Sequence, residues 1–142
     1  RFEVKYTAPD NILIIDDYAH HPSEVEATIK SARLGWDINK LIIVFQPHLY
    51  SRTKTFYKEF AHALSKADII IITEIYPSRE KKISGINSKM IFNQLKDVEA
   101  YLLDKTKITK KIEEIISNDD MVIVMGAGDI REITPEIYNR IK

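Results

Sequence analysis

The chain of 142 residues has no cysteine, only four glycines and no long apolar run. Without cysteine it forms neither disulfides nor thiolate metal sites, and it has no cysteine nucleophile. Its apolar stretches fall short of the roughly 20 residues that a membrane-spanning helix needs. Neither sign of charge is in excess, since 21 basic residues balance 21 acidic ones. This balance argues against a nucleic-acid or membrane-surface protein, because such binding relies on a basic excess.

Hydrophobic residues make up 44% of the chain and charged residues 30%, which are ordinary values for a folded, soluble domain. The length suits one domain with a real core. The chain begins with Arg1 and shows no signal-peptide pattern. We therefore expect a cytoplasmic domain that is a fragment of a longer protein.

Five apolar, β-branched runs predict the strands of a parallel sheet. They lie at 11–15, 40–46, 68–73, 98–103 and 121–125, and the fourth is the weakest. Because these runs do not alternate with polar residues, they fit strands that are buried on both faces. Segment 2–6 alternates, and it predicts an edge strand or a linker-side strand.

Helical patterns separate the apolar runs. Stripes of apolar residues predict one helix after Pro22, three more around 56–67, 91–95 and 108–116, and a fifth after Pro135. For the first helix, either Pro22 occupies the first helical position or Ser23 and Glu26 form a capping box. Strand–helix alternation implies right-handed crossovers. We predict one α/β domain with three layers: a mostly parallel sheet of about six strands, and helices on both faces.

Titratable side chains concentrate where the predicted strands end. The four segments are DDYAHHPSE (16–24), QPHLYSRT (46–53), TEIYPSRE (73–80) and GAGDI (126–130). In open α/β sheets, ligands bind beyond the carboxyl ends of the strands, where the strand order reverses. The sequence therefore predicts a binding site at this edge.

The first of these segments offers carboxylates and imidazoles. Asp16 and Asp17 suit a turn cap, a ribose-hydroxyl acceptor or a Mg²⁺ ligand. We expect one of His20 and His21 to hydrogen-bond a substrate and the other to cap a turn. Together with His48 they leave a His/Asp metal site, in a non-catalytic metal-binding module, as an alternative.

Arg52 lies near the start of the predicted second helix. Its guanidinium and the backbone N–H groups of the helix could together hold a carboxylate or a phosphate. Alternatively, Arg52 is a surface residue paired with Glu59 or Glu80.

The last two segments carry weaker signals. The glycines of 126–128 favour a tight turn over a phosphate contact, because the third glycine of the dinucleotide fingerprint is missing. Segment 76–88 is expected to be a polar loop that serves as a lid or a domain contact. No P-loop motif is present, so another domain would have to hold the phosphates in any ATP-dependent reaction.

The ordered motifs RF, DDYAHHP, FQPH-x-YSRT and MGAGDI resemble the carboxy-terminal domain of the Mur ligases, over essentially the whole chain. The resemblance implies a Rossmann-like fold within a three-domain, ATP-dependent ligase of peptidoglycan precursor synthesis. The two other domains would bind UDP-N-acetylmuramate and most of the ATP and Mg²⁺. In the implied reaction, the amine of L-alanine attacks an acyl phosphate of the muramyl carboxyl. By itself the domain is expected to be inactive.

The resemblance also implies roles for individual residues of the nucleotide site. Arg1 matches an arginine that faces the ATP phosphates, and Asp17 matches the carboxylate that binds the nucleotide ribose. This domain would thereby complete the ATP site.

At the amino-acid end of the site, Tyr18 and His20 match lining residues. Arg52, with His48 nearby, matches an arginine that holds the amino-acid carboxylate. Many family members carry a second arginine where this chain has Leu49, so the two-arginine clamp would be reduced to Arg52. A related ligase that attaches a recycled tripeptide to the same nucleotide shares the DDYAHHP-like segment and is the alternative, although QPHLYSRT is not expected in it.

Overall fold

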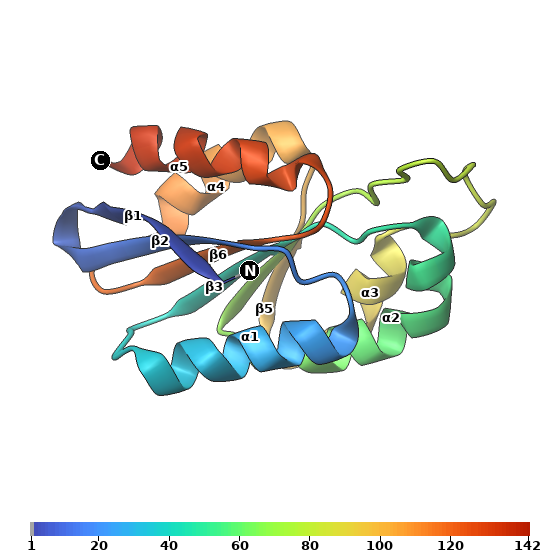
Figure 1. Cartoon of the computed structure of the whole chain (residues 1–142), viewed down its shortest axis with the longest axis horizontal. Helices are drawn as coiled ribbons and strands as arrows, with labels where there is room; N and C mark the ends of the chain where they lie inside the picture. Colours follow the sequence, from blue (N-terminus) through green and yellow to red (C-terminus); the bar gives the residue numbers. More distant parts are fainter. Residues whose placement is uncertain (1) are drawn as a thin grey trace.

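Six strands form a single sheet in the order β1-β2-β6-β3-β4-β5, in a computed structural model that describes residues 2–142 (Figure 1). Strand β1 runs antiparallel to β2, and all other neighbouring strands are parallel. The mostly parallel sheet and the edge position of segment 2–6 are thus confirmed. The strands are β1 (Glu3–Ala8), β2 (Ile12–Asp17), β3 (Leu41–Phe45), β4 (Ile69–Ile72), β5 (Glu99–Leu102) and β6 (Met121–Met125).

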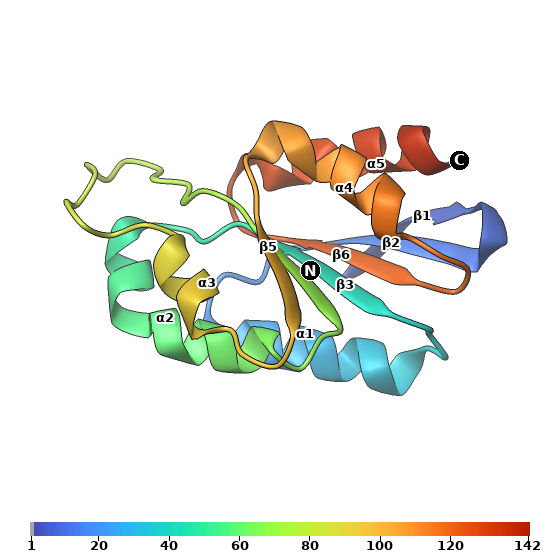
Figure 2. The ribbon, with the colours of Figure 1, turned by 180° about the vertical axis from the view of Figure 1, so that it is seen from behind.

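Helices cover both faces of this sheet, which confirms the three predicted layers (Figures 1 and 2). One face carries α1 (Pro22–Gly35), α2 (Tyr50–Leu64) and α3 (Lys89–Gln94), and the other carries α4 (Ile108–Ile115) and α5 (Ile133–Ile141). The fifth helix was predicted to follow Pro135, but it begins at Ile133, because proline is tolerated in the first helical turn. Across residues 2–142, no helix is both long and apolar enough to cross a membrane.

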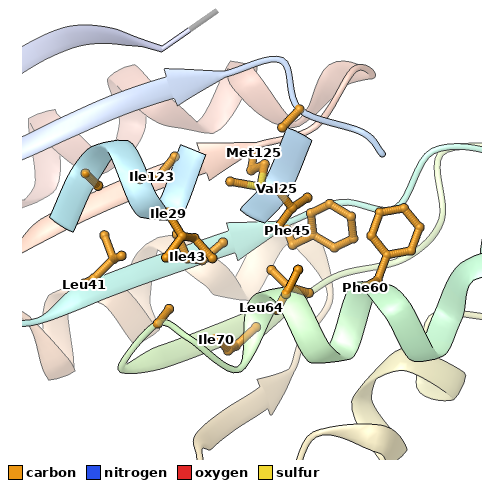
Figure 3. Close-up of a cluster of buried hydrophobic side chains, with 14 of the residues drawn as sticks. Val25, Ile29, Leu41, Ile43, Phe45, Phe60, Leu64, Ile70, Ile123 and Met125 are labelled. Carbon is orange, nitrogen blue, oxygen red and sulfur yellow. The ribbon is translucent and has the colours of Figure 1, made fainter. Parts of the chain in front are cut away.

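The core explains why the strand sequences are apolar at every position. All residues of β3, β4 and β6 are buried, since each of these strands has helices on both sides. On the α1–α3 face, Val25 and Ile29 of α1 and Phe60 and Leu64 of α2 pack over β3 (Figure 3). A second apolar cluster lies under α4 and α5.

The strand order places the predicted site. Strand β6 lies between β2 and β3, and the helices that follow β2 and β6 run to opposite faces of the sheet. The strand order therefore reverses beside β6, where open α/β sheets bind ligands. Backbone hydrogen bonds from Gly126 N–H to the Asp17 carbonyl (3.1 Å) and from Gln46 N–H to the Met125 carbonyl (3.0 Å) hold the three strand ends together.

Candidate functional site

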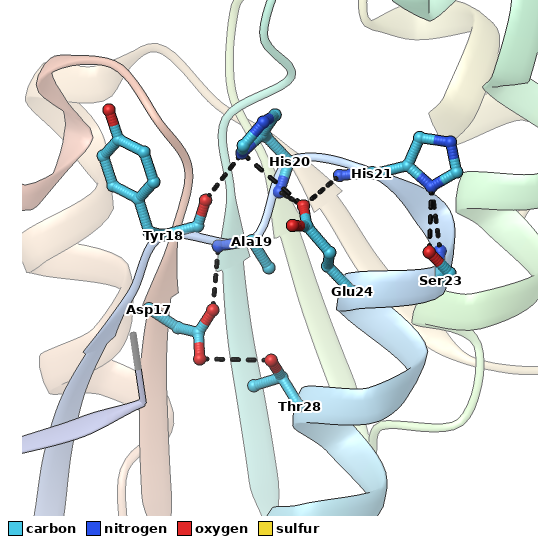
Figure 4. A network of polar contacts seen from close by, with 8 residues as sticks. All are labelled: Asp17, Tyr18, Ala19, His20, His21, Ser23, Glu24 and Thr28. Carbon is cyan, nitrogen blue, oxygen red and sulfur yellow. Dashed lines mark hydrogen bonds and ion pairs between the residues drawn. The ribbon is translucent and has the colours of Figure 1, made fainter.

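Asp17 ends β2 and is only 8% exposed. Its carboxylate accepts hydrogen bonds from the Ala19 N–H at 2.8 Å and from the Thr28 hydroxyl at 3.1 Å (Figure 4). These contacts fix the turn from β2 into α1. Each carboxylate oxygen can accept a further bond. Asp17 also lines a cavity of about 350 Å³, together with Phe2 and Thr28, so it can hold a ligand hydroxyl there.

Asp16 points to the other side of the strand, as expected for two successive residues of an extended chain. Its carboxylate accepts a hydrogen bond from the Thr134 hydroxyl of α5. Asp16 therefore anchors a helix. The remaining space beside it is a small cavity of about 130 Å³ that is also lined by Gly126 and Arg131.

His21 is the cap residue of α1. Its Nδ1 accepts a hydrogen bond from the Ser23 N–H at 3.3 Å, and the Glu24 carboxylate accepts the His21 N–H at 3.1 Å (Figure 4). Pro22 occupies the first helical position, as one prediction had it. The alternative box of Ser23 and Glu26 is wrong, because with His21 as the cap the third helical position falls on Glu24.

His20 faces the strand ends. Its Nδ1 lies 2.9 Å from the Tyr18 carbonyl oxygen (Figure 4). A carbonyl only accepts hydrogen bonds, so Nδ1 carries the proton, and in the neutral ring Nε2 keeps a free lone pair. The His20 ring centroid lies 5.9 Å from that of His48, which brings the ends of β2 and β3 into one site.

His48 and Arg52 carry buried polar atoms that no neighbouring group satisfies. Within the described part of the chain, His48 Nδ1 and one terminal guanidinium nitrogen of Arg52 have no hydrogen-bond partner. Buried polar groups are nearly always paired, so two unpaired polar nitrogens at a strand end indicate a ligand site. No ion pair of Arg52 with Glu59 or Glu80 occurs between residues 2 and 142, so that interpretation is not supported.

The loop that follows β4 supports this pair. Tyr76 stacks on the His48 ring with centroids 5.7 Å apart. Its backbone N–H donates to the Pro47 carbonyl at 2.8 Å, and its carbonyl accepts the Leu49 N–H at 2.9 Å. Farther along the loop, the Glu80 carboxylate binds the start of α2. The sequence predicted a lid or domain contact for this loop. It gave no role to Tyr76, and it suggested Glu80 only as an ion-pair partner of Arg52.

Glycines bring the end of β6 against the same loop. A Cβ atom on Gly128 would lie 2.7 Å from both Gln46 Oε1 and Tyr76 Cδ2, and one on Gly126 would lie 2.9 Å from Ile130 Cγ2. Both glycines are therefore needed for close packing, as the predicted tight turn requires. Gln46 also takes part in this contact, although the sequence gave no indication of such a role.

Known proteins match this chain over most of its length. The family model described as the glutamate ligase domain of Mur ligases matches residues 1–128. The chain belongs to the Mur ligase family. A UDP-N-acetylmuramate–L-alanine ligase from Pelodictyon phaeoclathratiforme is 39% identical over 98% of this chain. The chain spans about 30% of the length of such curated relatives.

Solved structures agree with this Mur ligase assignment. The UDP-N-acetylmuramate–alanine ligase of Thermotoga maritima has a TM-score of 0.75 and 32% identity, and the match covers 99% of this chain and 29% of that one. A separately crystallised domain from Haemophilus ducreyi, 23% identical, covers 100% of both chains with a TM-score of 0.73. This second likeness shows the fold alone.

The described residues of this Mur ligase chain do not form a metal-binding group of side chains. Among the residues that the structure describes, no three His, Asp or Glu side chains form a group able to hold one. His20 and His48 lie close to each other, but the His21 ring packs against Phe56 instead, with centroids 4.9 Å apart. The metal-binding module of three histidines is therefore not supported. Arg1, assigned to the ATP phosphates, lies outside the described residues.

The environment of His48 keeps its ring neutral near pH 7. Burial lowers the pKa of His48 below the ordinary 6.5, and the electrostatic effects of the neighbouring Arg52 and His20 lower it further, against a smaller opposing effect of Glu80. A neutral imidazole can donate one hydrogen bond and accept another. His48 can therefore contact a polar ligand without adding charge beside Arg52.

The lowered pKa of His48 predicts a loss of stability on acidification. The unfolded chain takes up a proton at His48 near pH 6.5, whereas the folded chain does so only at lower pH. The free energy of unfolding should therefore fall as the pH drops below 6.5 and level off below the folded pKa. Urea unfolding between about pH 7.5 and about pH 5 should show a steeper pH dependence for the wild type than for His48→Gln. Equal slopes for the two proteins would contradict the shift.

Proposed function

We propose that this chain is the carboxy-terminal, amino-acid-binding domain of an ATP-dependent ligase that joins L-alanine to UDP-N-acetylmuramate. The observation that carries the proposal is the buried, unpartnered pair of His48 Nδ1 and the Arg52 guanidinium nitrogen at the strand ends. The names of the relatives at about 39–40% identity support the same reaction. The amino-terminal UDP-sugar domain and the central ATPase domain would belong to the remainder of the protein.

Arg52 would hold the carboxylate of L-alanine. A guanidinium forms two parallel, charge-assisted hydrogen bonds with a carboxylate, and these bonds are stronger in a poorly hydrated site. Leu49 brings no charge, so Arg52 is the sole arginine of the expected clamp. His48 would donate or accept one additional bond. Tyr18, whose ring lies 5.7 Å from that of His20, would line the same end of the site.

The amine of L-alanine would then lie near His20. The free lone pair on His20 Nε2 can accept a hydrogen bond from the ammonium group, or its proton when the amine becomes a nucleophile. The amine would attack the carbonyl carbon of the acyl phosphate: the amide C–N bond forms, the C–O bond to phosphate breaks, and the departing phosphate takes up the second proton of the amine. Inorganic phosphate leaves. Fixing the amine in place converts a bimolecular step into an intramolecular one.

Asp17 would contact the ribose of ATP. Its carboxylate is held rigidly by the Ala19 N–H and the Thr28 hydroxyl and borders the cavity beside Phe2. The described residues fit a ribose hydroxyl but offer no cluster for Mg²⁺. Mg²⁺ would neutralise phosphate charge from the central domain. Closure of the two domains would exclude water from an acyl phosphate that is easily hydrolysed.

Phosphate release from the full-length protein tests the proposal. With ATP, Mg²⁺ and UDP-N-acetylmuramate present, adding L-alanine should produce phosphate and the amide product. Residues 1–142 alone should produce neither, because the phosphate-binding loop is missing. Turnover with the tripeptide L-alanyl-γ-D-glutamyl-diaminopimelate and not with L-alanine would replace the proposal with the recycling ligase. No turnover with either would reject both.

A further inference from the structure

Helix α2 begins without a cap of its own. The residue at its N-cap position is Leu49, whose backbone has φ 73° and ψ 139° and whose side chain has no capping group. The first turn also contains no acidic residue. The opening N–H groups of a helix need partners from outside it, and they favour negative charge. These N–H groups therefore need a partner outside the first turn, such as a side chain from another segment, water or a ligand.

Glu80 supplies that cap from 30 residues away. Its Oε1 accepts hydrogen bonds from the N–H groups of Tyr50 at 2.6 Å and Ser51 at 3.1 Å. Its Oε2 accepts one from the Ser51 hydroxyl. The loop that carries Glu80 joins β4 to α3 and is drawn in yellow-green in Figure 1. The hydrogen bond from the Ser51 hydroxyl has the largest effect on Glu80 and holds its pKa below the ordinary value, and the backbone hydrogen bonds from Ser51 and Tyr50 lower the pKa further.

The capped residues lie next to the two residues that are proposed to bind the substrate. Arg52 follows Ser51 in the first turn of α2, and His48 precedes Leu49. Because Glu80 already occupies the N–H groups of Tyr50 and Ser51, they are not available to a ligand anion. A substrate carboxylate is left with the guanidinium of Arg52, which keeps an unpartnered buried nitrogen.

We infer that Glu80 is a positioning residue for the amino-acid site: by capping α2 across the loop, it fixes the direction of Arg52 toward the substrate carboxylate. The inference rests on the proposed function. Glu80 touches no reacting atom in this arrangement. A side chain that must meet a carboxylate with two parallel bonds tolerates little displacement, so a frayed first turn would weaken substrate binding.

A competing role for the Glu80 carboxylate predicts the opposite change in L-alanine binding. If Glu80 were an internal mimic of the substrate carboxylate, displaced when L-alanine binds, removing it would strengthen binding. The sign of the change in KM therefore separates a positioning residue from an internal competitor.

Steady-state kinetics of the full-length ligase test the inference. Glu80→Ala should raise the KM for L-alanine about tenfold or more and leave the KM for ATP unchanged. Glu80→Gln keeps an oxygen that can accept the N–H groups, so it should stay within about threefold of the wild type. Ser51→Ala, which removes one of the three bonds, should shift the KM for L-alanine in the same direction by less. Glu59→Ala removes an exposed carboxylate from the same helix and should change nothing.

Two results would overturn the inference. The first is an unchanged KM for L-alanine in Glu80→Ala with an unchanged melting temperature. The second is a lowered KM, which would make Glu80 a competitor. If Glu80→Ala does not fold, the comparison of Ser51→Ala with the wild type decides. If the wild type turns over only the tripeptide, the proposed function fails, and the same KM comparison made with the tripeptide still tests Glu80.

Discussion

Replacing Arg52 with alanine in the full-length ligase should raise the KM for L-alanine by at least about 100-fold, because each of its two charge-assisted hydrogen bonds contributes roughly 1.5–3 kcal/mol. The guanidinium has a buried nitrogen without a partner in the described structure, so its bonding capacity is free for the substrate. The KM for ATP should change little, since the cavity beside Asp17 is lined by Phe2 and by residues of β2, α1 and the turn between them, and not by Arg52. Initial rates over a range of L-alanine concentrations measure both constants.

Two variants make the Arg52 result specific. Arg52→Lys keeps the charge but loses the planar fork, and we expect a KM for L-alanine between those of the wild type and Arg52→Ala. Lys58→Ala removes an exposed cation farther along α2 and should behave as wild type. The preference for L-alanine over L-alaninamide, which lacks the carboxylate, should also shrink in Arg52→Ala. A preserved preference would remove Arg52 from carboxylate recognition.

Substituting Gly128 with alanine should lower the free energy of unfolding by about 1–3 kcal/mol, the usual effect of overpacking a tight contact. The added methyl group would overlap the Tyr76 ring at Cγ and Cδ2 and the Gln46 side-chain oxygen. Cγ lies at the root of the ring, so the ring cannot move aside by rotating its far end. Urea unfolding of the chain measures the loss.

Gly35→Ala is the matched control for Gly128→Ala. A Cβ atom at Gly35 would meet nothing within 4 Å, and Gly35 is the last residue of α1. The Gly35→Ala variant should therefore be as stable as the wild type or slightly more stable. In the full-length ligase, Gly128→Ala should also raise the KM for L-alanine, because Tyr76 stacks on His48. Equal stabilities of Gly128→Ala and the wild type would show that the turn relaxes at no cost.

Much of the fold was predictable because its signals are local. Strands buried on both faces need apolar residues throughout, so β3, β4 and β6 could be read from uninterrupted runs. The start of α1 was less certain, because His21 is an unusual cap, and its contacts with Ser23 and Glu24 in the structure identify it. Glu80 could not be predicted as a helix cap, since its partners lie 29 and 30 residues away and no local pattern links them.

The sequence by itself determined the elements, the sheet edge that carries the polar segments and the resemblance to Mur ligases, because all three depend on residue types at fixed spacings. Only the tertiary structure decided which of these polar groups are still free. Asp16 is occupied by α5, His21 by the start of α1 and Glu80 by the start of α2. His48 and Arg52 keep unpaired atoms. A hydrogen-bonding group is available to a ligand only when packing gives it no other partner, and packing joins residues that are far apart in the sequence.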